Sequence, residues 1–274
     1  MYSRVKFIDK KGQHRYETVD GVWLQGVSEV SSIVPKDWLS SWGAKEAVKA
    51  LGYSDYAGDT ALAIETMKKI NEFKTPEEYI EFLKEAKGAS MRKSKTALID
   101  GKAGHLWLEM FCLARIRNTE LPKIPDGNLE RPIKQFLEWE EKHIKKWALS
   151  EAMVAYPAKG YAGTLDALAI MENDKLALID FKFASHISED YYLQTAGYQA
   201  TFEPYDIKID DRIIIRLPKT LEKEEWDKEN RKYKMVENNI EVEVVKTNYE
   251  MDRDTFFHCL FVKKWINIVK NLKG

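Results

Sequence analysis

The chain has 274 residues, of which 44% are hydrophobic, so it is long and apolar enough to bury the core of one large globular domain. Its 43 basic and 44 acidic side chains give a net charge of −1, which argues against non-specific wrapping around duplex nucleic acid but not against a local basic channel. The sequence has neither a signal-peptide pattern nor an apolar run of membrane-spanning length, so we expect a cytoplasmic protein without membrane contacts. Its two cysteines, Cys112 and Cys259, are too few for an iron–sulfur cluster or a zinc knuckle, and we expect both to be reduced.

The first half of the chain is predicted to form a small sheet followed by helices. Apolar and polar residues alternate around turn signals over residues 4–30, which indicates an antiparallel sheet. The sequence Thr75-Pro76-Glu77-Glu78 is a capping box that opens a helix through Lys87. Further helical patterns cover residues 37–51, 90–117 and 131–147. We expect the helix at 90–117 to be interrupted or bent near Gly101 and Gly104.

The second half has the pattern of an α/β core. Consecutive strands are predicted at 151–156, 162–170 and 175–183, with later strands at 212–217 and 240–245. A helix capped by Ser188 is predicted over 188–202, and an amphipathic helix over 252–272 closes the chain. The charged segment 222–234 fits a surface hairpin or a short helix. The order of elements predicts an α/β fold with appended helices.

Two aspartates, Asp166 and Asp180, lie inside apolar strand patterns, where a carboxylate is costly unless it is paired or binds a metal. If the turn between the strands is centred on Asn173, Asp166 lies opposite Asp180 and Thr164 lies opposite Lys182. Both aspartates and Lys182 then share one face of the sheet. The other face carries the core residues Ala177, Ile179 and Phe181. A register centred between residues 173 and 174 would instead put the aspartates on opposite faces.

Two facing carboxylates repel each other, and a divalent cation such as Mg²⁺ or Mn²⁺ would relieve that repulsion. A simpler interpretation is an ion pair between Lys182 and one aspartate in a partly exposed hairpin. His105 is a further candidate ligand, with Glu109 one turn later on the same helix face, although a lone histidine is more often a satisfied core or surface residue. A polar stripe on the predicted helix at 188–202 is formed by Tyr191, Gln194 and Tyr198, and it could equally face solvent.

The ordered set of these motifs resembles the RecB-like branch of the PD-(D/E)XK nuclease superfamily. The motifs are GKAGH with His105, GTLD with Asp166, DFK with Asp180 and Lys182, and QTAGY with Gln194 and Tyr198. The segment HRYETVDGVWLQGVSEVSSIV, followed by DWLSSW, is similar to the opening of phage-type and mitochondrial genome-maintenance exonucleases. The likeness covers residues 13–202. The GKAG spacing before the histidine and the aspartate in place of the commoner glutamate depart from the family pattern.

The resemblance implies a fold and a set of site residues. The fold would be a restriction-endonuclease-like core, with a central mixed β-sheet flanked by helices, plus an N-terminal β-hairpin and a helical extension. One or two Mg²⁺ or Mn²⁺ ions, and no iron–sulfur cluster, would be held by His105, Asp166, Asp180 and the carbonyl of Phe181. Lys182 would orient the attacking water or help to deprotonate it. Tyr191, Gln194 and Tyr198 would position the substrate strand, and Glu109, Glu151 and Thr164 would support the ligands.

The resemblance therefore predicts a divalent-metal-dependent DNA nuclease, a phosphodiesterase built as one domain over 1–274. Residues 1–149 would carry the small sheet, the helices and His105, and residues 150–274 the catalytic core and closing helix. We expect an exonuclease on single-stranded DNA or DNA ends in recombination, repair or phage DNA metabolism, in the cytoplasm or a phage host's cytoplasm, with recombination or replication proteins as possible partners. The alternatives are a structure-specific endonuclease and an inactive DNA-binding module of the same fold.

The stretch from Lys84 to Arg117 carries eight basic residues against three acidic ones. Such a run is usually a solvated helix face. In a nuclease it could also line a channel that delivers a single strand to the metal, and Arg92, Lys93 and Lys95 are then the candidate DNA contacts.

Overall fold

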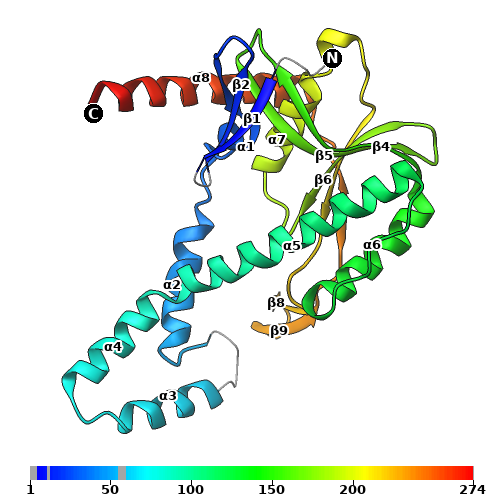
Figure 1. The fold of residues 1–274 in the computed structure, drawn as a ribbon. Helices are drawn as coiled ribbons and strands as arrows, with labels where there is room; N and C mark the ends of the chain where they lie inside the picture. Colours follow the sequence, from blue (N-terminus) through cyan, green and yellow to red (C-terminus); the bar gives the residue numbers. More distant parts are fainter. Residues whose placement is uncertain (1–4, 11–12, 55–59, 274) are drawn as a thin grey trace. The chain divides into compact units, whose positions relative to one another are not determined.

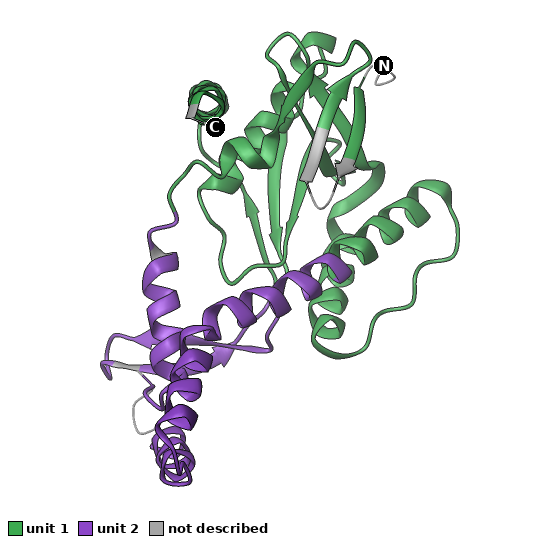
Figure 2. Cartoon of the chain, turned by 60° about the vertical axis from the view of Figure 1, so that its left-hand side comes forward, with its two compact units in different colours: residues 1–35, 104–218, 240–274 green, residues 36–103, 219–239 purple. Residues whose placement is uncertain are grey.

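The computed structural model describes residues 5–10, 13–54 and 60–273. The chain divides into two compact units (Figure 2). Unit 1 comprises residues 1–35, 104–218 and 240–274, and unit 2 comprises residues 36–103 and 219–239. Helix α5 (Ala89–Arg117) belongs to both, because the boundary falls between Ala103 and Gly104. The assignment of the whole chain to one nuclease domain stays a prediction.

Within the described residues, unit 1 is built on an eight-stranded mixed sheet. Two strand pairs are parallel, β3 with β5 and β6 with β7, and the remaining pairs are antiparallel. The strands are β1 (Val5–Lys10), β2 (Gln13–Thr18), β3 (Trp23–Gly26), β4 (Ile144–Tyr156), β5 (Tyr161–Met171), β6 (Leu176–Lys182), β7 (Asp211–Arg216) and β10 (Glu241–Val244). The predicted α/β class, the mixed central sheet and the N-terminal hairpin are confirmed.

Helices cover both faces of this sheet, and each face has its own core (Figure 1). On one face, α6 (Glu130–His143) and the C-terminal half of α5 pack on the strands through Phe111, Phe136 and Ile179. On the other face lie α1 (Val27–Ser31), α7 (Asp190–Ala200) and α8 (Tyr249–Lys273). The short 3₁₀ turn η1 (Gly127–Leu129) precedes α6 and contributes Leu129 to the first core, and η2 (Glu203–Tyr205) follows α7. The central strands β5, β6 and β7 are therefore shielded from water on both faces, as their apolar sequences require.

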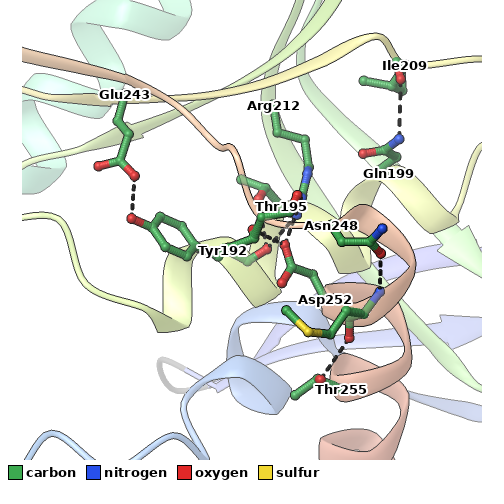
Figure 3. A network of polar contacts seen from close by, with 11 residues as sticks. Tyr192, Thr195, Gln199, Ile209, Arg212, Glu243, Asn248, Asp252 and Thr255 are labelled. Atoms are coloured by element: carbon green, nitrogen blue, oxygen red, sulfur yellow. Dashed lines mark hydrogen bonds and ion pairs between the residues drawn. The ribbon is translucent and has the colours of Figure 1, made fainter.

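A buried polar network fastens α7 and the start of α8 to the sheet (Figure 3). Arg212 of β7 is buried and donates to the carbonyl oxygen of Tyr192 at 3.0 Å and to Oδ2 of Asp252 at 2.7 Å. Asn248 accepts from the amide of Met251 at 2.9 Å, which caps the first turn of α8. The guanidinium is thus paired as a buried charge must be.

Unit 2 is mainly helical. It contains the N-terminal half of α5 together with α2 (Trp38–Ala50), α3 (Ala61–Asn71), α4 (Pro76–Lys87) and the hairpin β8 (Glu222–Asp227)–β9 (Lys232–Glu237). Thr75 and Glu78 form the reciprocal capping box predicted for α4. Lys45 of α2 donates to Glu224 of the hairpin at 2.9 Å. The hairpin alternative for the charged segment is confirmed.

Four local predictions are wrong. The helix expected through Trp147 ends at His143, because Ile144 and Trp147 pair with β5 as the start of β4. The expected sheet at 4–30 gives way to α1 at Val27, and helix α3 was not expected.

Ser188 does not cap α7, because its hydroxyl donates to Asp190. The interruption of helix α5 near Gly101 and Gly104 is also wrong, because the helix is continuous there, whereas a bend stays a prediction.

Candidate metal centre

The hairpin of β5 and β6 has the register centred on Asn173. Its ladder pairs Ala167 with Ile179 and Ile170 with Leu176, so the expected register is confirmed. Ala177, Ile179 and Phe181 lie in the core beneath α5 and α6, as predicted. The ladder stops at Ala167, however, so the pairings expected between Asp166 and Asp180 and between Thr164 and Lys182 do not form. Beyond that point β6 remains paired with β7 as far as Lys182.

The two strands part because β5 has different neighbours along its second edge. Strand β4 pairs with β5 over its whole length on one edge, from Tyr161 to Met171. The other edge is shared by β3, at Tyr161 and Ala162, and by β6, at 167–170. Residues 163–166 therefore lie at a fork in the sheet. At this fork the amide of Phe181 donates to Oδ2 of Asp166 at 2.7 Å, replacing a ladder bond by a bond to a side chain.

The strands also change face at this fork. Leu165 belongs to the core under α7 and α8, whereas Ala167 belongs to the core under α5 and α6. Residues two apart in a regular strand face the same way, so the backbone is distorted at Asp166. In the opposing strand, Ser150 pairs with Ala167 and Ala152 pairs with Leu165, which brings Glu151 opposite Asp166. Glu151 has a φ of +44°, an uncommon value for a residue with a side chain, and such outliers cluster at functional sites.

His105 reaches the fork from α5. Its Nδ1 lies 4.0 Å from Oδ2 of Asp166, and its ring meets the edge of Phe183 with centroids 5.3 Å apart. The preceding Gly104 is explained by the same aromatic ring, because a Cβ at this position would overlap Phe183. Gly104 thus permits a close approach rather than a break in α5.

His105, Glu151 and Asp166 each offer a ligand atom, and these atoms lie within 4.8 Å of one another. All three side chains are half-buried, and together they can hold a metal ion. Burial, with the charges of Asp166 and Glu109, raises the pKa of Glu151 to about 8. Asp180, which was expected in this group, is not part of it, and Glu151, which was expected only to support the ligands, is. The face change turns Glu151 toward Asp166, whereas Asp180 is paired with Lys182 instead.

Asp180 lies deeper, with only 1% of its surface exposed. Its Oδ2 is 2.7 Å from the ammonium of Lys182, but among the described residues neither carboxylate oxygen has a partner in hydrogen-bond geometry. Burial raises the pKa of Asp180, and the negative charge of Asp166 adds to that rise. The charges of Lys182 and His105 oppose it. A buried carboxylate with one oxygen paired only with Lys182 and the other without a partner, beside three other candidate ligands, is an environment that a divalent cation would complete.

Lys182 is held on several sides. Its Nζ donates to Oε1 of Gln194 at 3.0 Å and lies 4.8 Å from the ring centroid of Tyr191. Gln194 in turn donates to the hydroxyl of Tyr198 at 3.3 Å. Burial lowers the pKa of Lys182, but the carboxylates of Asp180 and Asp166 more than offset this, so its pKa is raised and it stays charged. The expected stripe of α7 is therefore a buried chain leading to the lysine rather than a face turned to solvent.

The remaining predicted residues lie in different places. Thr164 is at the fork, where its hydroxyl is 3.1 Å from that of Tyr16 in β2. Arg92, Lys93 and Lys95 belong to unit 2, where Arg92 donates to the carbonyl of Glu85 and Lys93 forms an ion pair with Glu46 at 2.8 Å. Contact of these three with DNA stays a prediction.

Two residues that contact the site, Tyr16 and Phe183, were not predicted from the sequence. Tyr16 reaches Thr164 through the β2–β3–β5 connection, a pairing between distant segments that no local pattern reveals. Phe183 follows directly after Lys182, and the glycine next to His105 was the available signal for a bulky neighbour.

Comparison with models of protein families gives no match for this chain, and comparison with curated proteins gives none either. In the described parts of the chain, no helix combines the length and the apolar composition that crossing a membrane requires. Function is therefore inferred from the residues of the site.

Proposed function

We propose that this protein is a divalent-metal-dependent DNA nuclease with a PD-(D/E)XK fold, acting as an exonuclease on single-stranded DNA or DNA ends. The observation that carries the proposal is the buried carboxylate of Asp180 beside the His105–Glu151–Asp166 group, because its Oδ1 has no hydrogen-bond partner among the described residues. A lysine paired with that carboxylate stands next to it. The residues of the site thus supply both metal ligands and a positioned cation, as phosphodiester hydrolysis requires.

The donor set fits Mg²⁺ or Mn²⁺, and Mn²⁺ better accepts the imidazole nitrogen. His105, Glu151 and Asp166 would hold the ion, with Asp180 and the carbonyl of Phe181 as the further ligands that the family resemblance implies. When bound, the ion would lower the pKa of an attacking water and neutralise charge on the phosphate. The ligands come from α5, β4, β5 and β6, so they are presented by ordered elements rather than by a loop.

The chain's own contribution is the position of Lys182. Asp180 and Gln194 hold its ammonium from two sides. One of its three N–H donors is then left to bond a water or a phosphate oxygen. A charged ammonium in this place can orient a water or hydrogen-bond a phosphate oxygen as negative charge develops there. Burial makes that interaction stronger than it would be in water.

The deciding experiment compares Lys182→Ala with Lys208→Ala, a lysine of unit 1 that pairs with Asp210 at the surface. Both variants should remain folded by circular dichroism. Only Lys182→Ala should lose cleavage of end-labelled linear DNA in Mg²⁺ or Mn²⁺, by about 10³-fold or more. Cleavage by Lys182→Ala at the rate of the unaltered protein would refute the proposal.

Two further measurements separate the alternatives. A circular single strand should resist digestion, because an exonuclease needs an end, whereas an endonuclease would cut it. Calorimetry with Mn²⁺ distinguishes an inactive DNA-binding module, which has no need of a metal. Absence of Mn²⁺ binding together with absence of cleavage would favour that module.

A further inference from the structure

The C-terminal turns of α8 have their polar and apolar sides reversed relative to an ordinary surface helix. Polar side chains face the rest of unit 1: Lys264 donates to the carbonyl oxygen of Lys159 at 2.8 Å. Asn267 likewise donates to Oε1 of Gln25 at 2.9 Å. Four large apolar side chains are instead exposed, by 73% at Phe261, 57% at Trp265, 60% at Ile268 and 81% at Leu272. A surface helix normally turns its apolar stripe to the core, so folding of unit 1 does not explain these four residues.

The N-terminal half of the same helix is anchored in the ordinary way. Phe256 and Leu260 are buried in the core with Tyr161, and Asp252 pairs with Arg212 (Figure 3). The C-terminal turns extend beyond the other elements of unit 1 (Figure 1). The four exposed residues, called here the α8 stripe, are therefore not needed to hold the helix in place.

The α8 stripe has the spacing of a coiled-coil seam. Phe261, Trp265, Ile268 and Leu272 follow one another at intervals of four, three and four residues, which are those of alternating d and a positions. In the same register, Val262 and Val269 occupy the e positions that flank the seam. Lys263 and Lys270 occupy f positions, on the side away from it.

We propose that the α8 stripe packs against the α8 stripe of a second copy of this chain, with the two helices antiparallel. A two-fold axis passing between residues 266 and 267 would bring Phe261 opposite Leu272 of the second copy and Trp265 opposite Ile268 of the second copy. In an antiparallel pair the e positions of both helices lie on one flank, so Val262 and Val269 extend the apolar contact. This pairing goes beyond the proposed nuclease activity and does not depend on it.

The exposed area is sufficient for such a contact. On the area scale of large side chains, the four exposed fractions leave roughly 500 Å² of apolar surface on each copy. Two stripes together would bury on the order of 1,000 Å², which is the lower limit for a specific interface. A dimer with a dissociation constant in roughly the micromolar range is therefore expected.

The distribution of charge favours a second copy over other occupants. Residues 255–273 contain no aspartate or glutamate. If the partner were an acidic helix or an anionic lipid surface, the lysines would be expected to border the stripe, as in basic amphipathic helices. Here valines border one flank, while Lys264 on the other is bonded to Lys159. An identical apolar surface matches this arrangement without bringing like charges together.

Sedimentation equilibrium of the full chain over micromolar concentrations tests the pairing. The test variant is Trp265→Glu with Leu272→Glu, and the matched control is Met67→Glu with Met91→Glu, two exposed methionines of unit 2. The unaltered protein and the control should form dimers with the same affinity. The stripe variant should bind itself more than about tenfold more weakly, with an unchanged circular dichroism spectrum and melting temperature.

Disulfide trapping tests the orientation. In a Cys259→Ser background, Trp265→Cys mixed with Ile268→Cys should form cross-linked dimers faster than either variant alone. Faster cross-linking of each variant with itself would indicate parallel helices and overturn the proposal. A monomeric unaltered protein, or a stripe variant that dimerises equally well, would also overturn it. So would a monomer that sediments with phosphatidylserine vesicles, because the stripe would then be a membrane contact.

Discussion

The backbone amide of Phe181 donates a 2.7 Å hydrogen bond to Oδ2 of Asp166 across the point where β5 and β6 part. The bond ties the carboxylate of one strand to the peptide bond between Asp180 and Phe181 on the next. Burial raises the pKa of Asp166, and the charge of Lys182 and this hydrogen bond only partly oppose it. The carboxylate is thus fixed in a position where its charge is unfavourable, and a bound cation would relieve this.

Asp166→Asn should greatly weaken metal binding without unfolding the protein. The asparagine carbonyl can still accept from Phe181, so the fork keeps its hydrogen bond, while the charge is lost. We expect Mn²⁺ affinity, measured by calorimetry, to fall by about 100-fold or more. In EDTA, urea unfolding should show an unchanged free energy or a gain of up to about 1 kcal/mol, because a buried charge has been removed. Asp254→Asn on the surface of α8 is the control, and equal Mn²⁺ affinity in the two variants would contradict the assignment.

Glu151 should make stability depend on pH in the metal-free protein. Its pKa is raised from 4.5 to about 8 on folding, so between these values the folded state holds a proton that the unfolded state has released. Stability should therefore fall as pH rises through this window, by at most about 1.4 kcal/mol per pH unit and by less for a partly solvated side chain. Urea unfolding in EDTA at pH 5 to 9 measures the slope, and Glu151→Gln should flatten it.

When Mn²⁺ is present, Glu151 should make the stabilisation by the metal increase with pH. Because a cation must displace the proton of Glu151, the rise in melting temperature caused by Mn²⁺ should grow as pH increases toward about 8. An identical rise at pH 6 and pH 8.5 would show that Glu151 is not a ligand.

Features of the candidate metal centre that depend on one hairpin could be predicted from the sequence. Features that depend on pairing between distant segments could not. The turn at Asn173 fixes the register of β5 and β6, so the approach of Asp166 to Asp180 could be predicted from one hairpin. The fork depends on β3 sharing an edge of β5 across more than a hundred residues, and the role of Glu151 depends on a single φ of +44°. Neither leaves a periodic signal in the chain.

One error in the fold has a similar cause. The apolar spacing of Phe136, Trp139, Ile144 and Trp147 fits a helix, but the last two residues pair with β5 and cover the aromatic core instead. Long-range sheet pairing therefore overrode the local helical pattern there.

Gly104→Ala should disturb the site through Phe183. A Cβ at Gly104 would overlap the phenylalanine ring, which packs against His105, so either the ring or α5 must shift. We expect a loss of about 1–3 kcal/mol in the free energy of unfolding and weaker Mn²⁺ binding. The second substitution Phe183→Leu should restore part of both, since it removes the overlapping atoms.

The control for this change is Gly43→Ala in helix α2 of unit 2. Its Cβ would lie 3.8 Å from Oγ of Ser90, an ordinary contact, so the higher helix propensity of alanine should stabilise the protein by about 0.5–1 kcal/mol. If Gly104→Ala also stabilised the protein, the close approach of Phe183 would not constrain this position.

Gln194→Met should lower kcat while leaving KM nearly unchanged. Gln194 is buried and accepts a 3.0 Å hydrogen bond from Lys182, so its effect on cleavage should pass through the lysine rather than through bound DNA. Methionine keeps the volume but removes the acceptor, and we expect kcat to fall about 10–100-fold with KM within about twofold. Tyr198→Phe removes only the longer bond of 3.3 Å to the amide and should change kcat less than about threefold. Steady-state kinetics on end-labelled single strands would decide, because a raised KM with unchanged kcat would mean that Gln194 contacts the substrate directly.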